Sequence, residues 1–254
     1  MRRVLQPGWL RLFSCFIALS AWTPLSSALF LLWTLPANAQ ESMVVFREDF
    51  RTLDNWKPFH FRKIEKHTLY STESEDGEHY LRAESKAAAS GLIYKGTFNV
   101  YQYSKVRWRW KVDNIYEKAD GRTKTGDDYP IRLYVLFEYD PEKGSVIDKM
   151  KYGLAKAMYG EYPPHSAINY VWSSVVWDQP FISSPRSDKV KVVALKSGPN
   201  KVGTWQEEQV DVLQDYRRMF GADPPAKASL GIMCDSDNTG EHAVSFVSSI
   251  EVYR

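Results

Sequence analysis

The sequence predicts an all-β protein, an antiparallel β-sandwich of the jelly-roll type. Residues 106–112 and 131–137 alternate apolar and polar side chains with a period of two, which is the pattern of a half-buried strand. Clusters of Gly, Pro, Asn and Asp separate such runs, as turns do between strands. The chain shows no strand–helix–strand spacing, so a parallel sheet with crossover helices is not expected.

The predicted strands follow one another along most of the chain. Early strands are expected near 44–50, 67–70, 80–84 and 92–98, and further strands at 106–112, 131–137, 167–177, 189–195, 205–212, 229–234 and 243–253.

Two helices are expected to interrupt the strands. Residues 213–220 place Leu213, Tyr216 and Phe220 at helical spacing and end at a glycine. A helical insertion near 145–159 carries Met150 and Leu154 on one apolar stripe. It lies in a long connection between two strands, which indicates either a functional lid or a loosely held insertion. Its lysines either contact anionic lipid or form a solvated face.

The N-terminus has the features of an export signal. Basic residues open the chain, two apolar blocks follow, and Ala37-Asn38-Ala39 matches a cleavage site. We therefore expect a signal peptide at 1–39, a single β-sandwich domain at 40–254, and a periplasmic or secreted protein. The alternative is an uncleaved membrane anchor at 12–35, which is long enough to span a bilayer.

Charge and motifs exclude several function classes. The leader contains three arginines and no acid, so 30 basic residues remain against 31 acidic ones, and net charge gives no support for nucleic-acid binding. The sequence has no nucleophile elbow, zinc-protease motif, phosphate loop or paired-cysteine motif. We expect no metal and no cofactor. Cys234, the one cysteine outside the leader, alternates with apolar residues and is expected to be a buried, unreactive thiol.

Three charged residues are expected on non-core strand faces. By strand alternation, Arg132, Glu207 and Asp235 point away from the core of their respective strands. If the three strands are neighbours, these side chains form a polar groove on one sheet. The alternative is a solvated outer face with weak ion pairs.

The acidic turn at 235–241 has two interpretations. Asp235, Asp237 and Thr239 alternate before Gly240, which approximates the beginning of a calcium loop. Phe246, however, stands where the closing ligand is required. A hairpin turn built on Asp and Asn accounts for the same residues without a metal, and we favour it.

An ordered series of motifs resembles a bacterial family of domains of unknown function, number 3047. The motifs are Asp127-Asp-Tyr-Pro-Ile-Arg132, Asn169-Tyr-Val-Trp172, Gly203-Thr-Trp-Gln-Glu207, Pro224-Pro225 and Asp235–Glu241. The resemblance implies an exported jelly-roll-like domain with no assigned reaction, similar in architecture to carbohydrate-binding modules. It also implies site roles for Asp127, Asp128, Arg132, Trp172, Glu207, Asp235, Asp237 and Asn238.

We therefore expect a protein that binds or processes a carbohydrate or another polar ligand of the cell envelope. In catalysis, Glu207 would act with Asp128 or Asp235, because glycoside hydrolysis uses two carboxyl groups. Asp127, Arg132, Trp172, Asp237 and Asn238 would bind the ligand. The alternative is a non-catalytic envelope assembly or scaffold protein that docks through the 145–159 helix. Whether the protein is an enzyme stays open at this point.

Overall fold

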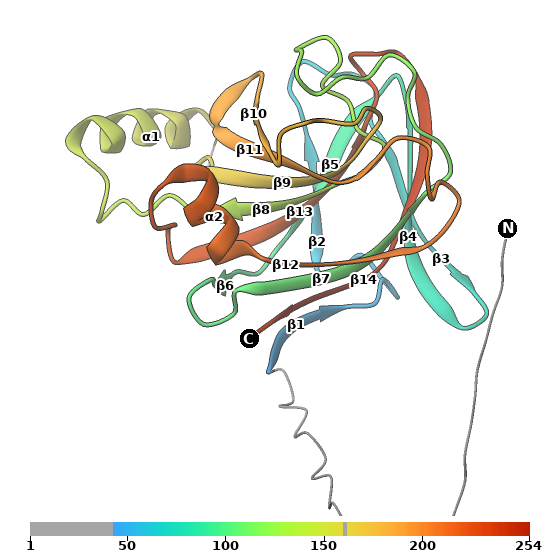
Figure 1. The fold of residues 1–254 in the computed structure, drawn as a ribbon. Helices are drawn as coiled ribbons and strands as arrows, with labels where there is room; N and C mark the ends of the chain where they lie inside the picture. The colour runs from blue at the N-terminus through green and yellow to red at the C-terminus, as the bar shows by residue number, and fades with distance from the viewer. Residues whose placement is uncertain (1–42, 160–161) are drawn as a thin grey trace, which may run out of the picture. The chain divides into compact units, whose positions relative to one another are not determined.

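Two β-sheets form the protein over the residues that the computed structural model describes, 43–159 and 162–254 (Figure 1). The predicted signal peptide lies outside these residues. The six-stranded sheet has the order β12-β7-β14-β4-β3, with β1 paired to β14. Its strands are β1 (Val44–Glu48), β3 (Leu69–Glu75), β4 (Glu78–Lys86), β7 (Lys105–Val112), β12 (Gln206–Asp211) and β14 (His242–Tyr253).

The eight-stranded sheet has the order β10-β11-β9-β8-β13-β5-β2, with β6 paired to β13. All described strand pairs are antiparallel except β11 with β9, which are parallel. The all-β sandwich is thereby confirmed, with this one departure from an antiparallel arrangement. Its strands are β2 (Trp56–His60), β5 (Ala89–Tyr94), β6 (Phe98–Asn99), β8 (Arg132–Phe137), β9 (Ser166–Ser173), β10 (Ile182–Ser184), β11 (Ser187–Ser197) and β13 (Lys227–Asp235).

The core lies between the sheets and follows the period-two pattern. On β7 the apolar residues from Val106 to Val112 are all at most 1% exposed, while the intervening basic residues stay partly exposed. Trp110 contacts Trp172 of the facing sheet, with ring centroids 6.2 Å apart. Fully burying a valine side chain such as that of Val106 or Val112 stabilises the fold by roughly 1.5–3 kcal/mol. The core therefore contains both Trp110 and Trp172.

Both predicted helices are present: α1 (Val146–Tyr159) and α2 (Val212–Phe220). The Asp211 side chain accepts hydrogen bonds from the backbone of Leu213 and Gln214, which caps the N-terminus of α2. Gly221 ends this helix in the left-handed conformation, with φ of 66°. The α1 helix lies in the connection between β8 and β9 and projects from the sandwich (Figure 1). No helix in the described ranges is long and apolar enough to cross a membrane.

The acidic turn joins two different sheets. It follows β13 of the eight-stranded sheet and precedes β14 of the six-stranded sheet. The hairpin interpretation is therefore wrong, because the flanking strands do not pair with each other. The turn is a crossover that must be held by contacts from elsewhere in the chain.

Candidate functional site

An arginine–aspartate pair lies on the outer face of the eight-stranded sheet. The β8 and β13 strands are neighbours, and Arg132 is opposite Met233 in their register. The Arg132 Nε donates to Asp235 Oδ1 at 2.8 Å, and its Nη2 binds the second carboxylate oxygen. The two residues are only 5% and 1% exposed. The sequence correctly predicted that they share a non-core face, but not that the loops above would bury them.

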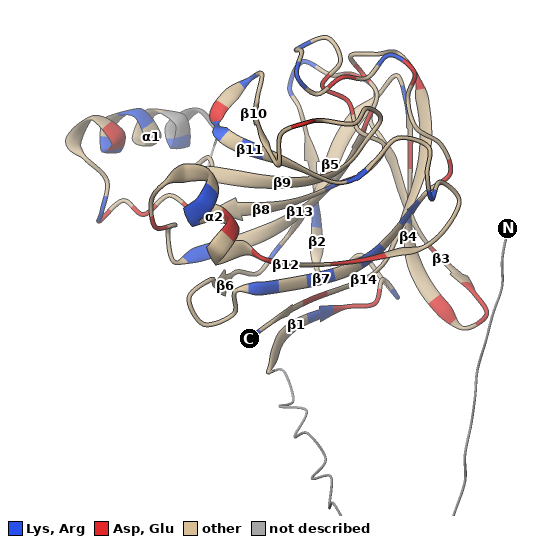
Figure 2. Ribbon diagram, in the orientation of Figure 1, with Lys and Arg blue, Asp and Glu red and all other residues tan. Residues whose placement is uncertain are grey.

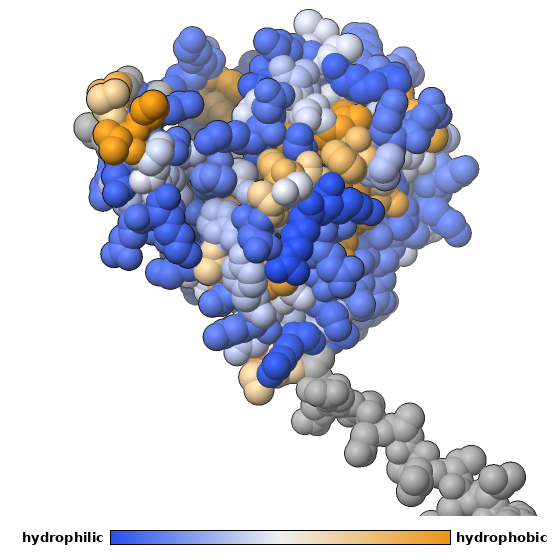
Figure 3. Space-filling view, turned by 60° about the vertical axis from the view of Figure 1, so that its left-hand side comes forward, coloured by the Kyte–Doolittle hydropathy of each residue, from blue (hydrophilic) through white to orange (hydrophobic). Residues whose placement is uncertain are grey.

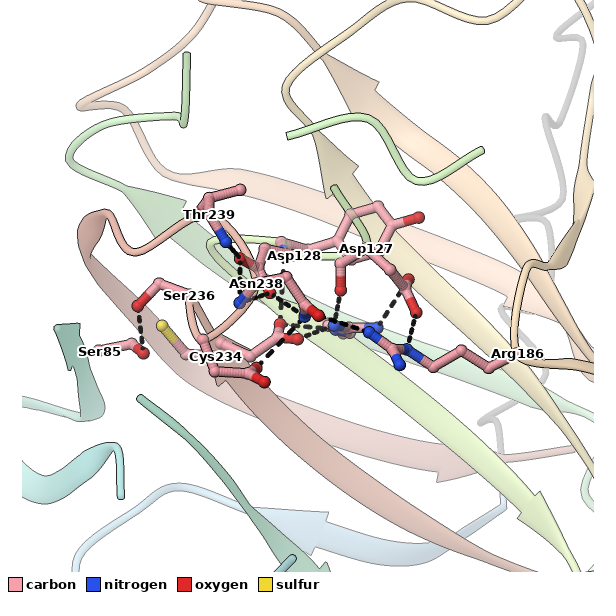
Figure 4. A network of polar contacts seen from close by, with 12 residues as sticks. Ser85, Asp127, Asp128, Arg186, Cys234, Ser236, Asn238 and Thr239 are labelled. Carbon is pink, nitrogen blue, oxygen red and sulfur yellow. Dashed lines mark hydrogen bonds and ion pairs between the residues drawn. The ribbon is translucent and has the colours of Figure 1, made fainter. Parts of the chain in front are cut away.

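Asp127 extends this pair into the loop that precedes β8. The Arg132 Nη2 donates to the Asp127 carbonyl at 2.8 Å, and Nη1 lies 3.6 Å from its carboxylate. Arg186, from the turn between β10 and β11, donates to the other Asp127 oxygen at 2.9 Å and also binds Asn238 (Figure 4). The sequence gives no signal for Arg186, because its role depends on a contact with residues far away along the chain.

Asp128 holds the acidic turn in place. Its carboxylate is fully buried and accepts hydrogen bonds from the Asn238 amide side chain at 2.7 Å and from the Thr239 backbone at 2.6 Å (Figure 4). The Asn238 backbone N–H also donates to it at 3.0 Å. Carboxylates commonly fix turns in this way. Asp128 thus fixes the crossover turn, which has no strand pairing of its own to hold it.

Three carboxylates are close enough to consider a cation. Oxygens of Asp128, Asp235 and Asp237 lie within 4.8 Å of one another. Asp237 is exposed, and desolvation followed by the charge of Asp128 raises its pKa above the usual range. The oxygens of Asp128 and Asp235 already accept N–H donors from the protein. A cation would have to displace those donors, so the geometry fits a closed hydrogen-bond network better than a metal site.

Two predicted site residues lie elsewhere. Glu207 is exposed on β12, an edge strand of the six-stranded sheet, opposite Arg109. The core separates it from Asp235, so the expected pairing of Glu207 with Asp128 or Asp235 is wrong. Trp172 is fully buried in the core and donates its ring N–H to the Gly198 carbonyl at 3.3 Å. Its assignment to ligand binding is also wrong.

The acid next to Glu207 on β12, Glu208, is buried in the sandwich. Glu208 points inward and accepts hydrogen bonds from Trp110 at 3.0 Å and from Lys196 at 2.6 Å. It is in phase with Val210, so strand alternation places an acid at a core position, and this is the signal in the sequence that points to Glu208. Because it is engaged by two donors inside the sandwich, Glu208 stabilises the core and has no access to a ligand.

A groove of about 830 Å³ lies next to the arginine–aspartate pair, over β2, β5, β13 and β8. Strand register aligns Phe59, Gly91, Met233 and Arg132 across these four strands in one row. The first three line the groove, and the Arg132 pair closes the row at its end. The Arg132 Nη1 donates to the hydroxyl of Tyr134 at 3.2 Å, and Tyr134 also lines the groove. The buried network thus fixes a polar group of the groove.

The floor of the groove is low and its walls are aromatic. Gly91 and Gly231 leave the backbone of two adjacent strands open to a ligand, which is a recognised use of glycine within a strand. Phe59 and Phe61 pack edge to face at 5.0 Å on the β2 side. Tyr139 and Tyr162 pack at 5.5 Å on the side where the α1 connection begins and ends. The groove could not be predicted from the sequence, because it depends on which strands are neighbours.

Fold and site together define a β-sandwich protein with an aromatic groove on one sheet and a buried ionic network at the end of that groove. The chain belongs to a family of proteins of unknown function, DUF3047, whose model matches residues 54–251. The resemblance drawn from the sequence motifs is thereby confirmed.

Other similarities are short or remote. A segment of 78 residues is 31% identical to one component of the NAD(P)H-quinone oxidoreductase of Picosynechococcus sp.; it covers 31% of this chain and only 18% of that protein. The family 11 carbohydrate-binding module of Clostridium thermocellum superposes with a TM-score of 0.38 at 10% identity, covering 81% of this chain and 92% of the module. Lectin I-B4 of Griffonia simplicifolia superposes with a TM-score of 0.37 at 9% identity, covering 82% of this chain and 97% of the lectin.

Proposed function

We propose that the protein is exported and binds a carbohydrate in the groove over β2, β5, β13 and β8. The observation that carries this proposal is the groove itself. Its volume of about 830 Å³ is within the usual range of ligand sites. Flat aromatic side chains such as Phe59 and Tyr134 offer stacking surfaces for the apolar faces of sugar rings. The glycine floor lets a flat ligand approach the sheet.

The buried network supports binding by orienting a donor. The guanidinium of Arg132 can only donate, so the Tyr134 oxygen is the acceptor in their contact. The Tyr134 hydroxyl proton is then directed away from Arg132 and can serve an oxygen of the ligand. Asp127, Asp235 and Asn238 act behind this contact by fixing Arg132 and the loops around it.

The groove is proposed to bind its ligand without hydrolysing it. Hydrolysis needs two carboxyl groups on either side of the glycosidic bond. Asp128 and Asp235 are buried and hydrogen-bonded, and Glu207 lies on the other sheet. No pair among the acids predicted to be catalytic therefore faces the groove.

A glycan array followed by calorimetric titration tests the proposal. Two variants address the groove: Phe59→Ala removes a wall side chain that is 39% exposed, and Gly231→Val fills the floor. A Cβ at Gly231 meets only ordinary contacts, the nearest at 3.5 Å, and circular dichroism checks that the two further methyl groups of valine leave the fold intact. We expect each variant to weaken binding at least about tenfold, because Phe59→Ala removes a stacking ring and Gly231→Val blocks the floor sterically; tenfold corresponds to about 1.4 kcal/mol.

The matched control is Leu69→Ala on β3 of the six-stranded sheet, whose side chain is 68% exposed and does not line the groove. It should bind like the wild type. Absence of any glycan ligand on the array would refute the proposal. Binding that both groove variants retain would refute the location.

A further inference from the structure

The α1 helix presents an apolar stripe to solvent. Ile147 and Met150 are each 73% exposed and Leu154 is 64% exposed, although all three are large hydrophobic residues. At 100° per residue they lie within about 60° of one another around the helix axis. Val146, which is 85% exposed, extends the same side at the N-terminal end. Figure 3 shows apolar side chains gathered at its upper left edge, where α1 projects.

The opposite side of α1 is fixed to the sandwich. Tyr152 is only 4% exposed and stacks on Tyr139 with ring centroids 3.8 Å apart. Lys189 of β11 donates to the Tyr152 hydroxyl at 3.0 Å. The orientation of the helix is therefore determined by packing, and the apolar stripe is held outward. A helix that only covered the core would bury its apolar face instead.

The charged residues of α1 indicate what kind of partner surface the apolar stripe binds. Lys149 and Lys151 are exposed and lie on the two sides of the stripe, and Figure 2 shows the basic bands along the helix. The acid of the first turn, Asp148, is bound by the Ser145 hydroxyl at 2.7 Å as part of the helix cap. The stripe is thus bordered by positive charge.

We infer that α1 docks on an anionic lipid surface. An apolar helix face with flanking lysines is the pattern of helices that lie in the interface of a bilayer. Protein interfaces are instead depleted in lysine and enriched in aromatic residues and arginine, and none of the described side chains of the stripe is aromatic or an arginine. The negative charge of the lipid head groups complements Lys149 and Lys151. Because the ends of the α1 connection form one wall of the groove, docking would hold the groove beside the membrane.

Vesicle co-sedimentation of the protein that lacks the predicted signal peptide tests this inference, since the apolar leader would bind lipid by itself. We expect binding to vesicles of phosphatidylglycerol and phosphatidylcholine, and clearly weaker binding to phosphatidylcholine alone. Ile147→Gln/Met150→Gln/Leu154→Gln should reduce binding at least about tenfold, because it removes the inserted side chains. Glutamine is a good helix former, so α1 should persist. Lys149→Gln/Lys151→Gln should reduce it about fivefold for each lysine removed.

The control for general surface hydrophobicity is Leu69→Gln/Val176→Gln, which changes two residues that are 68% and 72% exposed outside α1. It should bind as the wild type does, and circular dichroism should show all variants folded. The inference is overturned if the wild type does not sediment with anionic vesicles, or if the triple glutamine variant binds them undiminished. A protein complex that forms through the stripe while vesicles stay unbound would also overturn it and assign the surface to a protein partner.

Discussion

The guanidinium of Arg132 makes contacts with groups from three separate parts of the chain. It binds Asp235 of β13, the loop residue Asp127 and its own strand neighbour Tyr134, and it lies 4.5 Å from the centre of the Tyr129 ring. A buried charge is tolerated only when partners of this kind compensate its loss of hydration. Removal of one partner should therefore cost much more than the loss of one surface hydrogen bond.

Asp235→Asn should destabilise the protein by about 3 kcal/mol, because it leaves the buried Arg132 charge with a weaker partner. Urea unfolding monitored by tryptophan fluorescence measures the effect. The control is Asp223→Asn, which breaks an ion pair on the surface. The Asp223 side chain is 65% exposed and that of its partner Arg217 is 51% exposed. That change should cost less than about 1 kcal/mol. Equal costs for the two variants would show that the network is not a structural support.

The ionised carboxylate of Asp237, unlike that of Asp235, should destabilise the folded protein, and this effect should depend on pH. Desolvation, and secondarily the charge of Asp128, raise its pKa in the folded state above the unfolded value. The folded protein therefore binds this proton more tightly, and the ionised group destabilises the fold at pH values above the folded pKa. This penalty disappears as the pH falls through the folded pKa and below the unfolded value of about 3.9.

Asp237→Asn should accordingly stabilise the protein slightly at pH 7, by less than about 1 kcal/mol because solvent screens an exposed charge. At pH 3 the variant and the wild type should be equally stable. Unfolding curves at the two pH values provide the comparison. A variant that is less stable than the wild type at pH 7 would contradict the raised pKa.

At the scale of single elements, α2 shows how local sequence determines a boundary. One Asp211 oxygen accepts the backbone N–H groups of Leu213 and Gln214 at 3.1 and 3.0 Å. The sequence pattern predicts a start at 213, one residue after the observed start at Val212, and the end at 220 is confirmed. Boundaries of this kind can be predicted because caps and left-handed glycines act over a few residues.

Asp211→Ala should destabilise the protein by about 1 kcal/mol through the loss of this cap, whereas Asp211→Asn should lose only a small part of that. Thermal melts of the two variants measure the difference. The conservative variant is needed because Asp211 also accepts a hydrogen bond from Ser104 at 3.1 Å. If both variants lost the same stability, the charge or the Ser104 contact would matter more than the cap.

The prediction of strands succeeded where the pattern is local and failed where pairing decides. The alternation of β7 and β8 identified their core faces correctly, and Arg132 and Asp235 were placed on the same outer surface. Glu207 was also given the correct face of its own strand, but its strand belongs to the other sheet. Short strands such as β2, with a proline and little alternation, were not predicted. The local sequence determines which face of its strand a residue lies on, but it does not determine which strands are neighbours.

At the scale of the whole molecule, the site depends on contacts between distant parts of the chain. Asp128 precedes the Asn238 turn by 110 positions, and Arg186 reaches Asp127 across 59 positions. No local pattern encodes such distances, so the sequence could indicate the acidic turn as unusual but not what holds it. The same holds for the groove, whose floor joins Gly91 with Gly231.

Calcium tests whether the acidic turn is held by the protein alone. An ion that binds only the folded state stabilises the whole molecule by RT ln(1 + [L]/Kd), on the order of 2.7 kcal/mol at a hundredfold excess over Kd. For a protein of this size the melting temperature would rise by about 5–10 °C. Asp128 and Asp235 already accept N–H donors from Asn238, Thr239 and Arg132, so an ion would gain ligands only by breaking those contacts. We therefore expect millimolar calcium to leave the melting temperature unchanged within about 1 °C. A rise of several degrees that Asp237→Asn abolishes would instead show that Asp128, Asp235 and Asp237 release their donors to hold a cation.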